Sequence, residues 1–125
     1  MTANQVIVDL DAIQHNFREI RKITAPGTGI IAVIKSDAYG HGMVPVARAL
    51  AQEAPACFGV FELDEALTLK QDGCRVPILI LMGARREEIP AVVEEGFTIC
   101  LFQEEIAREL SEKALSRHVI APVHV

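Results

Sequence analysis

Ile30-Ile31-Ala32-Val33-Ile34-Lys35-Ser36-Asp37-Ala38-Tyr39-Gly40-His41-Gly42 joins a short apolar run to a polar, glycine-rich segment. The first five residues are apolar and mostly β-branched, a pattern that predicts a buried strand. Lys35 is the first charge after this run, and the small and polar residues behind it predict a loop. Parallel α/β folds carry their chemistry at the carboxyl ends of strands. Lys35 is therefore expected to enter a site, the alternative being an ordinary solvated lysine.

The chemistry that such a segment favours begins with the lysine. An ammonium group that is removed from water gives up its proton more readily, and a neutral amine serves as a nucleophile or a general base. Gly40 and Gly42 allow the backbone to approach a ligand closely, and Tyr39 adds a ring and a hydroxyl group. A helix is predicted from Met43 onward, with Pro45 in its first turn, and a helix start beside such a loop can hold a phosphate. Together these groups suggest pyridoxal phosphate.

The composition narrows the class of protein. The chain has 125 residues, half of them hydrophobic, and a net charge of −5, which predicts one domain and argues against a nucleic-acid partner. No apolar run approaches the roughly 20 residues of a membrane helix, and the residues from Met1 to Gln5 show no secretory signal pattern. Cys57, Cys74 and Cys100 form an odd set without close pairing, which favours a reduced, cytoplasmic protein. The four histidines lack metal-ligand spacing, so no metal is expected.

Apolar runs and amphipathic segments alternate along the whole chain. A first helix, capped by Asp9 or Asp11, carries Ile13, Phe17 and Ile20 on one face. The expected strands are residues 30–34, 56–61, 77–82, 97–102 and 119–125, and the later helices are residues 44–52, 63–71, 86–95 and 103–115. This alternation predicts repeated βα units on a parallel sheet.

Two architectures share this pattern. One is a complete five-stranded, flavodoxin-like domain with a doubly wound sheet. The other is the N-terminal portion of a (β/α)8 barrel, about five of its eight strands. The sequence stops at Val125 inside the last apolar run, without a helix to cover the final strand. Because parallel sheets are buried on both faces, this ending favours the partial barrel.

Two motifs resemble the alanine racemase family. Residues 32–42 resemble its pyridoxal-phosphate attachment motif, with Ser36 and Asp37 in place of the more common Ala and Asn. Residues 8–16 resemble the opening of the family, and residues 63–66 and 77–81 fit further along. The resemblance implies that residues 1–125 are the N-terminal part of a pyridoxal-phosphate-binding α/β barrel domain, without the rest of the barrel and the C-terminal β domain.

The resemblance also implies roles for individual residues. Lys35 would anchor pyridoxal 5'-phosphate and act as a base on one face of the substrate, and Tyr39 would hold the cofactor phosphate through its hydroxyl. Val33 and Leu81 would pack near the cofactor, the alternative being ordinary barrel core. His41 is expected to be structural. The second base, a tyrosine of the partner subunit, and an arginine at the pyridine nitrogen are implied beyond residue 125.

The activity implied by the resemblance is racemisation of L-alanine to D-alanine for peptidoglycan, by two-base proton transfer in a cytoplasmic homodimer. The 125 residues alone are expected to be inactive and to self-associate through open sheet edges. Other pyridoxal-phosphate proteins of this fold remain open: a serine or broad-specificity racemase, a cofactor homeostasis protein or a basic-amino-acid decarboxylase. A flavodoxin-like, non-catalytic module is the alternative from another class, although its strand ends would be Lys35-Ser36 and Met82-Gly83 rather than the acidic residues of a phospho-receiver.

Overall fold

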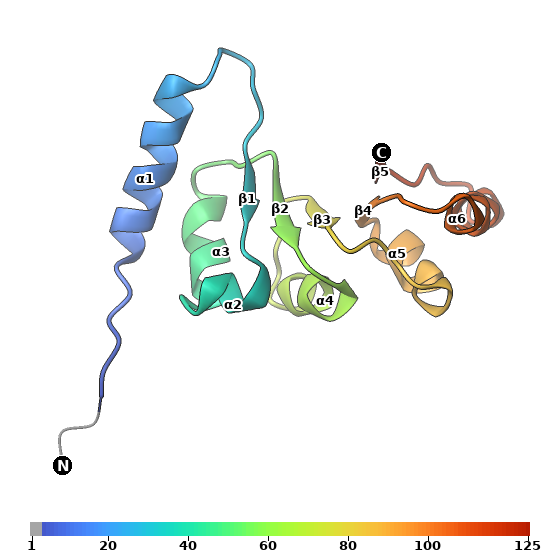
Figure 1. Cartoon of the computed structure of the whole chain (residues 1–125), viewed down its shortest axis with the longest axis horizontal. Helices are drawn as coiled ribbons and strands as arrows, with labels where there is room; N and C mark the ends of the chain where they lie inside the picture. Colours follow the sequence, from blue (N-terminus) through green and yellow to red (C-terminus); the bar gives the residue numbers. More distant parts are fainter. Residues whose placement is uncertain (1–3) are drawn as a thin grey trace.

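The computed structural model describes residues 4–125 and contains a five-stranded, fully parallel sheet (Figure 1). Met1, Thr2 and Ala3, on which part of the signal-peptide expectation rests, lie outside the described residues. The strands are β1 (Ile31–Val33), β2 (Cys57–Val60), β3 (Ile78–Ile80), β4 (Thr98–Cys100) and β5 (Val123–His124). All five expected strands are confirmed.

Each strand is shorter than the apolar run that predicted it. The ladder nevertheless extends slightly past the strand ends, because Leu81 donates its backbone N–H to Val60 at 2.8 Å and Leu101 donates to His124 at 2.7 Å. Hydrophobicity reports burial, whereas a strand is bounded by its hydrogen bonds. The apolar residues outside the ladders therefore belong to the connections that lead into and out of the sheet.

The order of the strands decides between the two expected architectures. The sheet runs β1-β2-β3-β4-β5, so every strand lies beside its neighbour in sequence. A flavodoxin-like sheet has the order 2-1-3-4-5, in which the chain reverses direction beside the first strand. The flavodoxin-like alternative is therefore wrong for this chain. A sequential parallel sheet is the topology of a (β/α)8 barrel.

As expected, one helix precedes β1 and helices follow the first four strands, but a short helical segment directly after β1 lies where a loop was predicted. The helices are α1 (Leu10–Ile23), α2 (Lys35–Tyr39), α3 (Met43–Ala51), α4 (Leu63–Gln71), η1 (Arg86–Glu88), α5 (Ile89–Glu95) and α6 (Glu104–Ser116). The helix expected over residues 86–95 is divided into a 3₁₀ turn and an α-helix, with Pro90 in the first turn of α5. Asp9 rather than Asp11 caps α1, since its Oδ1 accepts the N–H of Ala12 at 3.0 Å.

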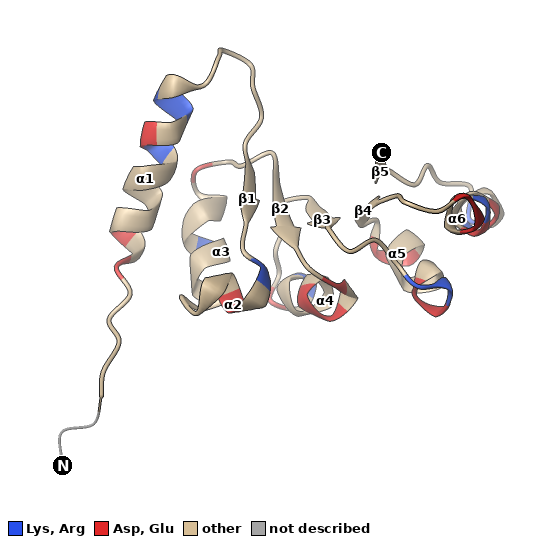
Figure 2. Ribbon diagram, in the orientation of Figure 1, with Lys and Arg blue, Asp and Glu red and all other residues tan. Residues whose placement is uncertain are grey.

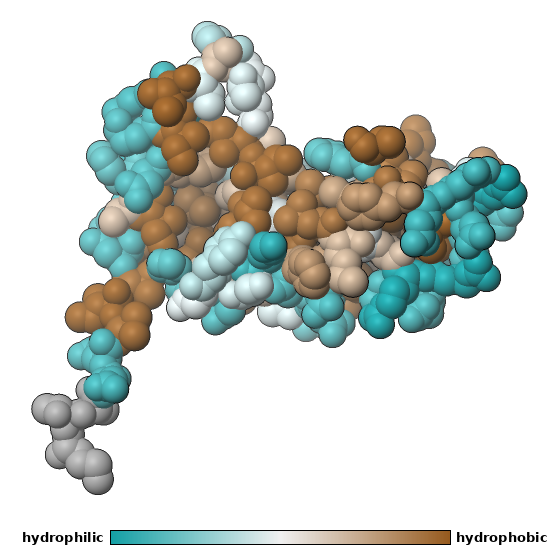
Figure 3. Space-filling view, in the orientation of Figure 1, coloured by the Kyte–Doolittle hydropathy of each residue, from teal (hydrophilic) through white to brown (hydrophobic). Residues whose placement is uncertain are grey.

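The hydrophobic core lies between the sheet and these helices. Strand residues that alternate toward the helices are fully buried, and they share one cluster with apolar residues of α3, α4, α5 and α6. The strand members with no exposed surface are Phe58, Val60, Ile80 and Ile99. Figure 3 shows hydrophobic side chains gathered over the central strands, with polar residues toward the helices. The helices therefore cover one face of the sheet.

The first helix differs from its expected packing. Phe17 is buried and Ile13 is half-buried, but Ile20 is 48% exposed. Gln14, which is not part of the predicted apolar stripe, is buried, and its side-chain amide donates to the carbonyl of Ala49 in α3 at 2.8 Å. Helical periodicity identifies an apolar stripe, but it gives no sign that an amide is buried with a backbone partner.

Charged side chains lie on the helices and loops, and the strands carry none (Figure 2). Ion pairs join neighbouring helices around the outside of the sheet. They are Arg18–Glu53, Arg48–Asp72, Lys70–Glu95, Arg86–Glu109 and Arg117–Glu94. Such exposed pairs contribute about 0–1 kcal/mol each, so packing supplies most of the stability. Over residues 4–125, no helix has the length and apolar character needed to cross a membrane.

Candidate active site

The face of the sheet opposite the helices is open over β1 and the end of β2, whereas Leu79 on β3 is buried on the same face. Val33 on β1 is 41% exposed, and Phe61, directly after β2, is 42% exposed. Between them, Gly59 on β2 has no side chain. A Cβ atom built on Gly59 would lie 3.3 Å from Val33 and 3.5 Å from Leu81. The side chains of Val33 and Leu81 therefore leave no room for a side chain at position 59, and glycine lets them pack together there, at the strand ends where barrel enzymes hold ligands.

Lys35 lies at the same end of the sheet. It follows β1 directly and is half-buried, and its Nζ lies 5.5 Å from the centre of the Phe61 ring. A cation over an aromatic ring is attracted by the negative face of that ring. Phe61 thus fixes the amine above the end of β2. The strongly desolvated lysine expected from sequence is not produced by these residues alone, because the face around the amine is open.

The segment after Lys35 is a left-handed turn. Ser36, Asp37, Ala38 and Tyr39 have φ values of 52°, 54°, 52° and 55°, so α2 is not an ordinary right-handed helix. Each left-handed residue other than glycine costs roughly 1–2 kcal/mol. Four in succession persist only where the surroundings hold them, and such segments concentrate at functional sites. The sequence had predicted no more than a loop here.

Two acidic side chains hold this turn by accepting backbone N–H groups. Glu65, in the first turn of α4, accepts from Ser36 at 2.6 Å through Oε1 and from Phe61 at 2.6 Å through Oε2. Asp37 accepts from Met43 at 2.7 Å and so caps the start of α3. Because that N–H group is already used, it is not open to the phosphate that the sequence predicts at the start of α3.

The other expected site residues lie on or beside the same turn. Tyr39 is 61% exposed, so its hydroxyl is free to meet a ligand. Ala38 is buried and anchors the turn to the core. The Nδ1 atom of His41 lies 2.8 Å from the carbonyl oxygen of Ala38, which agrees with the structural role expected for it.

The structure thus brings Lys35, Val33 and Leu81 to one face and places Tyr39 at the end of the turn. Three residues of this face were missed from sequence: Gly59, Phe61 and Glu65. Alternation along β2 could have placed Gly59 and Phe61 on one side of the strand. Glu65 belongs to residues 63–66, which fit the family pattern, but its reach across to the turn depends on how α4 packs.

The cysteines and acidic groups add no second reactive centre to this face. All three cysteines are free and half-buried. Burial raises the pKa of the Cys57 and Cys74 thiols above the ordinary value, which disfavours the reactive thiolate. Within residues 4–125, no three histidine, cysteine or acidic side chains are placed to hold a metal ion together.

A sequential parallel sheet with a lysine at the end of its first strand defines the chain as part of a barrel of the ligand-binding (β/α)8 class. The family described as "Alanine racemase, N-terminal domain" matches residues 8–125. The chain therefore belongs to the alanine racemase N-terminal domain family.

Relatives and solved structures agree with this assignment. Alanine racemase 1 of Caldanaerobacter subterraneus is 41% identical over 121 residues, which are 97% of this chain and 31% of that protein. Alanine racemase of Syntrophobacter fumaroxidans is 38% identical over all of this chain and 33% of its own length. The chain thus spans about a third of these relatives. The alanine racemase of Clostridium difficile 630 superimposes with a TM-score of 0.89 at 33% identity, covering 94% of this chain and 32% of that one.

A further structural neighbour carries a different substrate in its name. The histidine racemase of Leuconostoc mesenteroides superimposes with a TM-score of 0.80 at 27% identity, over 91% of this chain and 30% of its own. The same part of the barrel therefore occurs in racemases named for amino acids of different size and polarity.

Proposed function

We propose that residues 1–125 form the N-terminal part of the pyridoxal-phosphate-binding barrel of an amino-acid racemase, with alanine as the substrate. The observation that carries the proposal is the placement of Lys35. Its amine lies at the carboxyl end of β1, over Phe61, and Val33 and Leu81 pack over Gly59 at the same strand ends. A lysine amine beside an apolar surface is what an aldehyde cofactor with a flat ring requires.

The residues present fit the cofactor in chemistry. Lys35 would bind the aldehyde carbon through Nζ, Tyr39 would donate its hydroxyl to the phosphate, and Val33 and Leu81 would contact the ring over Gly59. When bound, pyridoxal phosphate supplies an electron sink that acidifies the Cα–H bond of an amino acid. Lys35, as a free amine, would take or return that proton on one face.

The opposite face needs a second group, and this chain has no tyrosine except Tyr39. We therefore propose that the tyrosine comes from a partner subunit of a homodimer, and that the 125-residue chain alone does not racemise alanine. The proposed setting is the cytoplasm, with D-alanine supplied for peptidoglycan. Racemisation by the 125-residue chain is measured by the exchange of deuterium into the Cα position of either enantiomer of alanine. Clear turnover would contradict the two-base scheme.

A second candidate is a racemase for another amino acid. It is favoured by the histidine racemase among the structural neighbours, whose fold matches over most of this chain. Val33, Phe61 and Leu81, at the strand ends that carry Lys35, are apolar, so these five strands offer no charged group by which to choose between the two substrates.

The proposed cofactor site is tested by reductive trapping. The chain is mixed with pyridoxal phosphate, treated with borohydride, and weighed by mass spectrometry. We expect one reduced pyridoxyl phosphate per chain, loss of that label in Lys35→Ala, and an unchanged label in Lys22→Ala. Lys22 is a suitable control because it lies on α1, exposed and paired with Glu19 at 2.6 Å. Equal labelling of both variants would overturn the proposal.

A further inference from the structure

One carboxylate connects the two segments that place the lysine amine. Glu65 uses both oxygens, each at 2.6 Å from a backbone nitrogen. One nitrogen belongs to Ser36, the residue directly after Lys35, and the other belongs to Phe61, whose ring lies 5.5 Å from the lysine Nζ. Glu65 therefore ties together the backbones of the amine and of the ring that holds it.

The hydrogen bond from Ser36 to Glu65 is made just past the end of the β1–β2 ladder. The ladder between β1 and β2 ends with the N–H of Ile34, which donates to Gly59 at 2.9 Å. Ser36, two residues further on, is the first residue of the left-handed turn. Its N–H is beyond the reach of the ladder, and an accepted N–H at this point fixes the direction in which the chain leaves the strand. Charge-assisted bonds of this length are the strong ones.

We propose that Glu65 is a positioning residue for Lys35, an inference that rests on the proposed function of Lys35. Its carboxylate holds the start of the left-handed turn against the end of β2, and so keeps the amine over Phe61 and beside Gly59. Glu65 does not touch the cofactor in this scheme. It acts through the backbone of Ser36 and Phe61.

A purely structural role as a cap for α4 is the competing explanation, and the neighbouring carboxylate provides a matched control. Glu62 is the N-cap residue of α4, but its side chain makes no capping hydrogen bond. Removal of Glu62 thus changes the same helix start and the same net charge without touching the turn. Glutamine at position 65 retains one acceptor oxygen in place of two, so it should restore part of the function.

The test compares the rates at which pyridoxal phosphate is trapped on Lys35 in the unmodified chain and in Glu65→Ala, Glu65→Gln and Glu62→Ala. We expect a loss on the order of tenfold in Glu65→Ala, because small misplacements of a reacting group are costly. Glu65→Gln should lie between, and Glu62→Ala should match the unmodified chain. The absorbance of the lysine-bound cofactor should weaken in the same order. Amide hydrogen exchange should quicken at Ser36 and Phe61 in Glu65→Ala while the core amides of β2 and β3 stay protected.

The outcomes separate the two proposals. Trapping in Glu65→Ala at the unmodified rate, or an equal loss in Glu62→Ala, would overturn the positioning role while leaving the function of Lys35 intact. Unchanged exchange at Ser36 and Phe61 would also overturn it, because the two hydrogen bonds would then not hold the backbone. A chain that is not trapped at all would overturn the proposed function itself, and the positioning role with it.

Discussion

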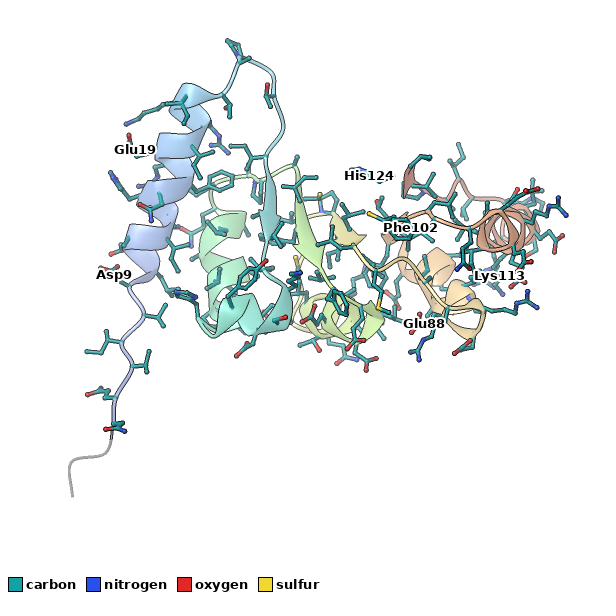
Figure 4. The ribbon with its side chains drawn as sticks, viewed as in Figure 1. Asp9, Glu19, Glu88, Phe102, Lys113 and His124 are labelled. Carbon is teal, nitrogen blue, oxygen red and sulfur yellow. The ribbon has the colours of Figure 1, made fainter. Side chains whose placement is uncertain are left out.

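The two faces of the sheet contrast sharply. On the face toward the helices, Phe58, Val60 and Ile80 are fully buried. On the opposite face, Val33 and Phe61 retain about two-fifths of their surface, and Gly59 has no side chain at all. In Figure 4, Glu19 and Lys113 lie out on α1 and α6, and His124 lies on β5 at the edge of the sheet. The face toward the helices holds most of the core, and the opposite face carries the ligand chemistry that we propose.

The largest expected effect tests this division with two valines. Val60→Ala should lower the free energy of unfolding by about 2 kcal/mol, because a fully buried side chain leaves a cavity. Val33→Ala removes the same atoms from the open face and should cost less than about 1 kcal/mol. Urea unfolding followed by circular dichroism measures both. Equal losses would show that the open face is packed as tightly as the core.

The next effect concerns Gly59, at the end of the sheet that carries Lys35. A side chain there would collide with Val33 and Leu81 and displace them, so Gly59→Val should reduce trapping of pyridoxal phosphate roughly tenfold, with Gly59→Ala less affected. The loss of stability should also be larger in the valine variant, since even a Cβ atom would lie only 3.3 Å from Val33. Trapping kinetics with a circular dichroism control check this, and undiminished trapping in the valine variant would place the cofactor elsewhere.

The left-handed turn is the one part of the site that also serves stability. Asp37→Ala should lower the free energy of unfolding by about 1 kcal/mol, the usual cost of losing an N-cap. Asp37→Asn retains an acceptor for the N–H of Met43, so its free energy of unfolding should fall by only a few tenths of a kcal/mol. Thermal melting compares the two, and identical melting curves would mean that Asp37 does not cap α3.

The smallest effect is a dependence of stability on pH from the outer ion pairs. Hydrogen bonds from Arg18 and Arg48 hold the pKa of Glu53 and Asp72 below their ordinary values of 4.5 and 3.8. A carboxylate with a lowered pKa in the folded state adds stability above its unfolded pKa and loses it as the pH falls through the folded pKa. The urea concentration at the midpoint of unfolding should therefore decrease as the pH is lowered below about 4. The decrease should be less steep in Arg48→Ala, which lacks the partner of Asp72. If the midpoint depends on pH as steeply in Arg48→Ala as in the unmodified chain, the Arg48–Asp72 pair does not contribute to the loss of stability in acid.

Much of this architecture was predictable from the sequence. The apolar runs identified all five strands, and Gly96 marked the end of α5, where it has a φ of 71°. The order of the strands was not predictable, because hydrophobic periodicity is the same for a barrel and for a doubly wound sheet. Strand pairing had to be seen before the flavodoxin-like alternative could be rejected.

The site was predictable only where it lies in one continuous segment. Lys35 and Tyr39 lie in one motif, so the sequence predicted both as site residues. Phe61 and Glu65 come from the next βα unit, β2 and α4, and contact the segment of Lys35 and Ser36. Nothing in residues 57–71 themselves predicts these contacts. The left-handed turn was also hidden, because Ser36 and Ala38 have no intrinsic preference for a positive φ. The surrounding hydrogen bonds impose that conformation.

The most direct test of the central claim is the distribution of trapped cofactor over the lysines of the unmodified chain. Pyridoxal phosphate is supplied below one equivalent, reduced in place, and the labelled peptides are mapped. We predict that nearly all of the label is on Lys35, because its amine alone lies at the carboxyl ends of the strands, over Phe61, whereas the other lysines lie on α1, α4 and α6. Label spread evenly over Lys22, Lys35, Lys70 and Lys113 would contradict it.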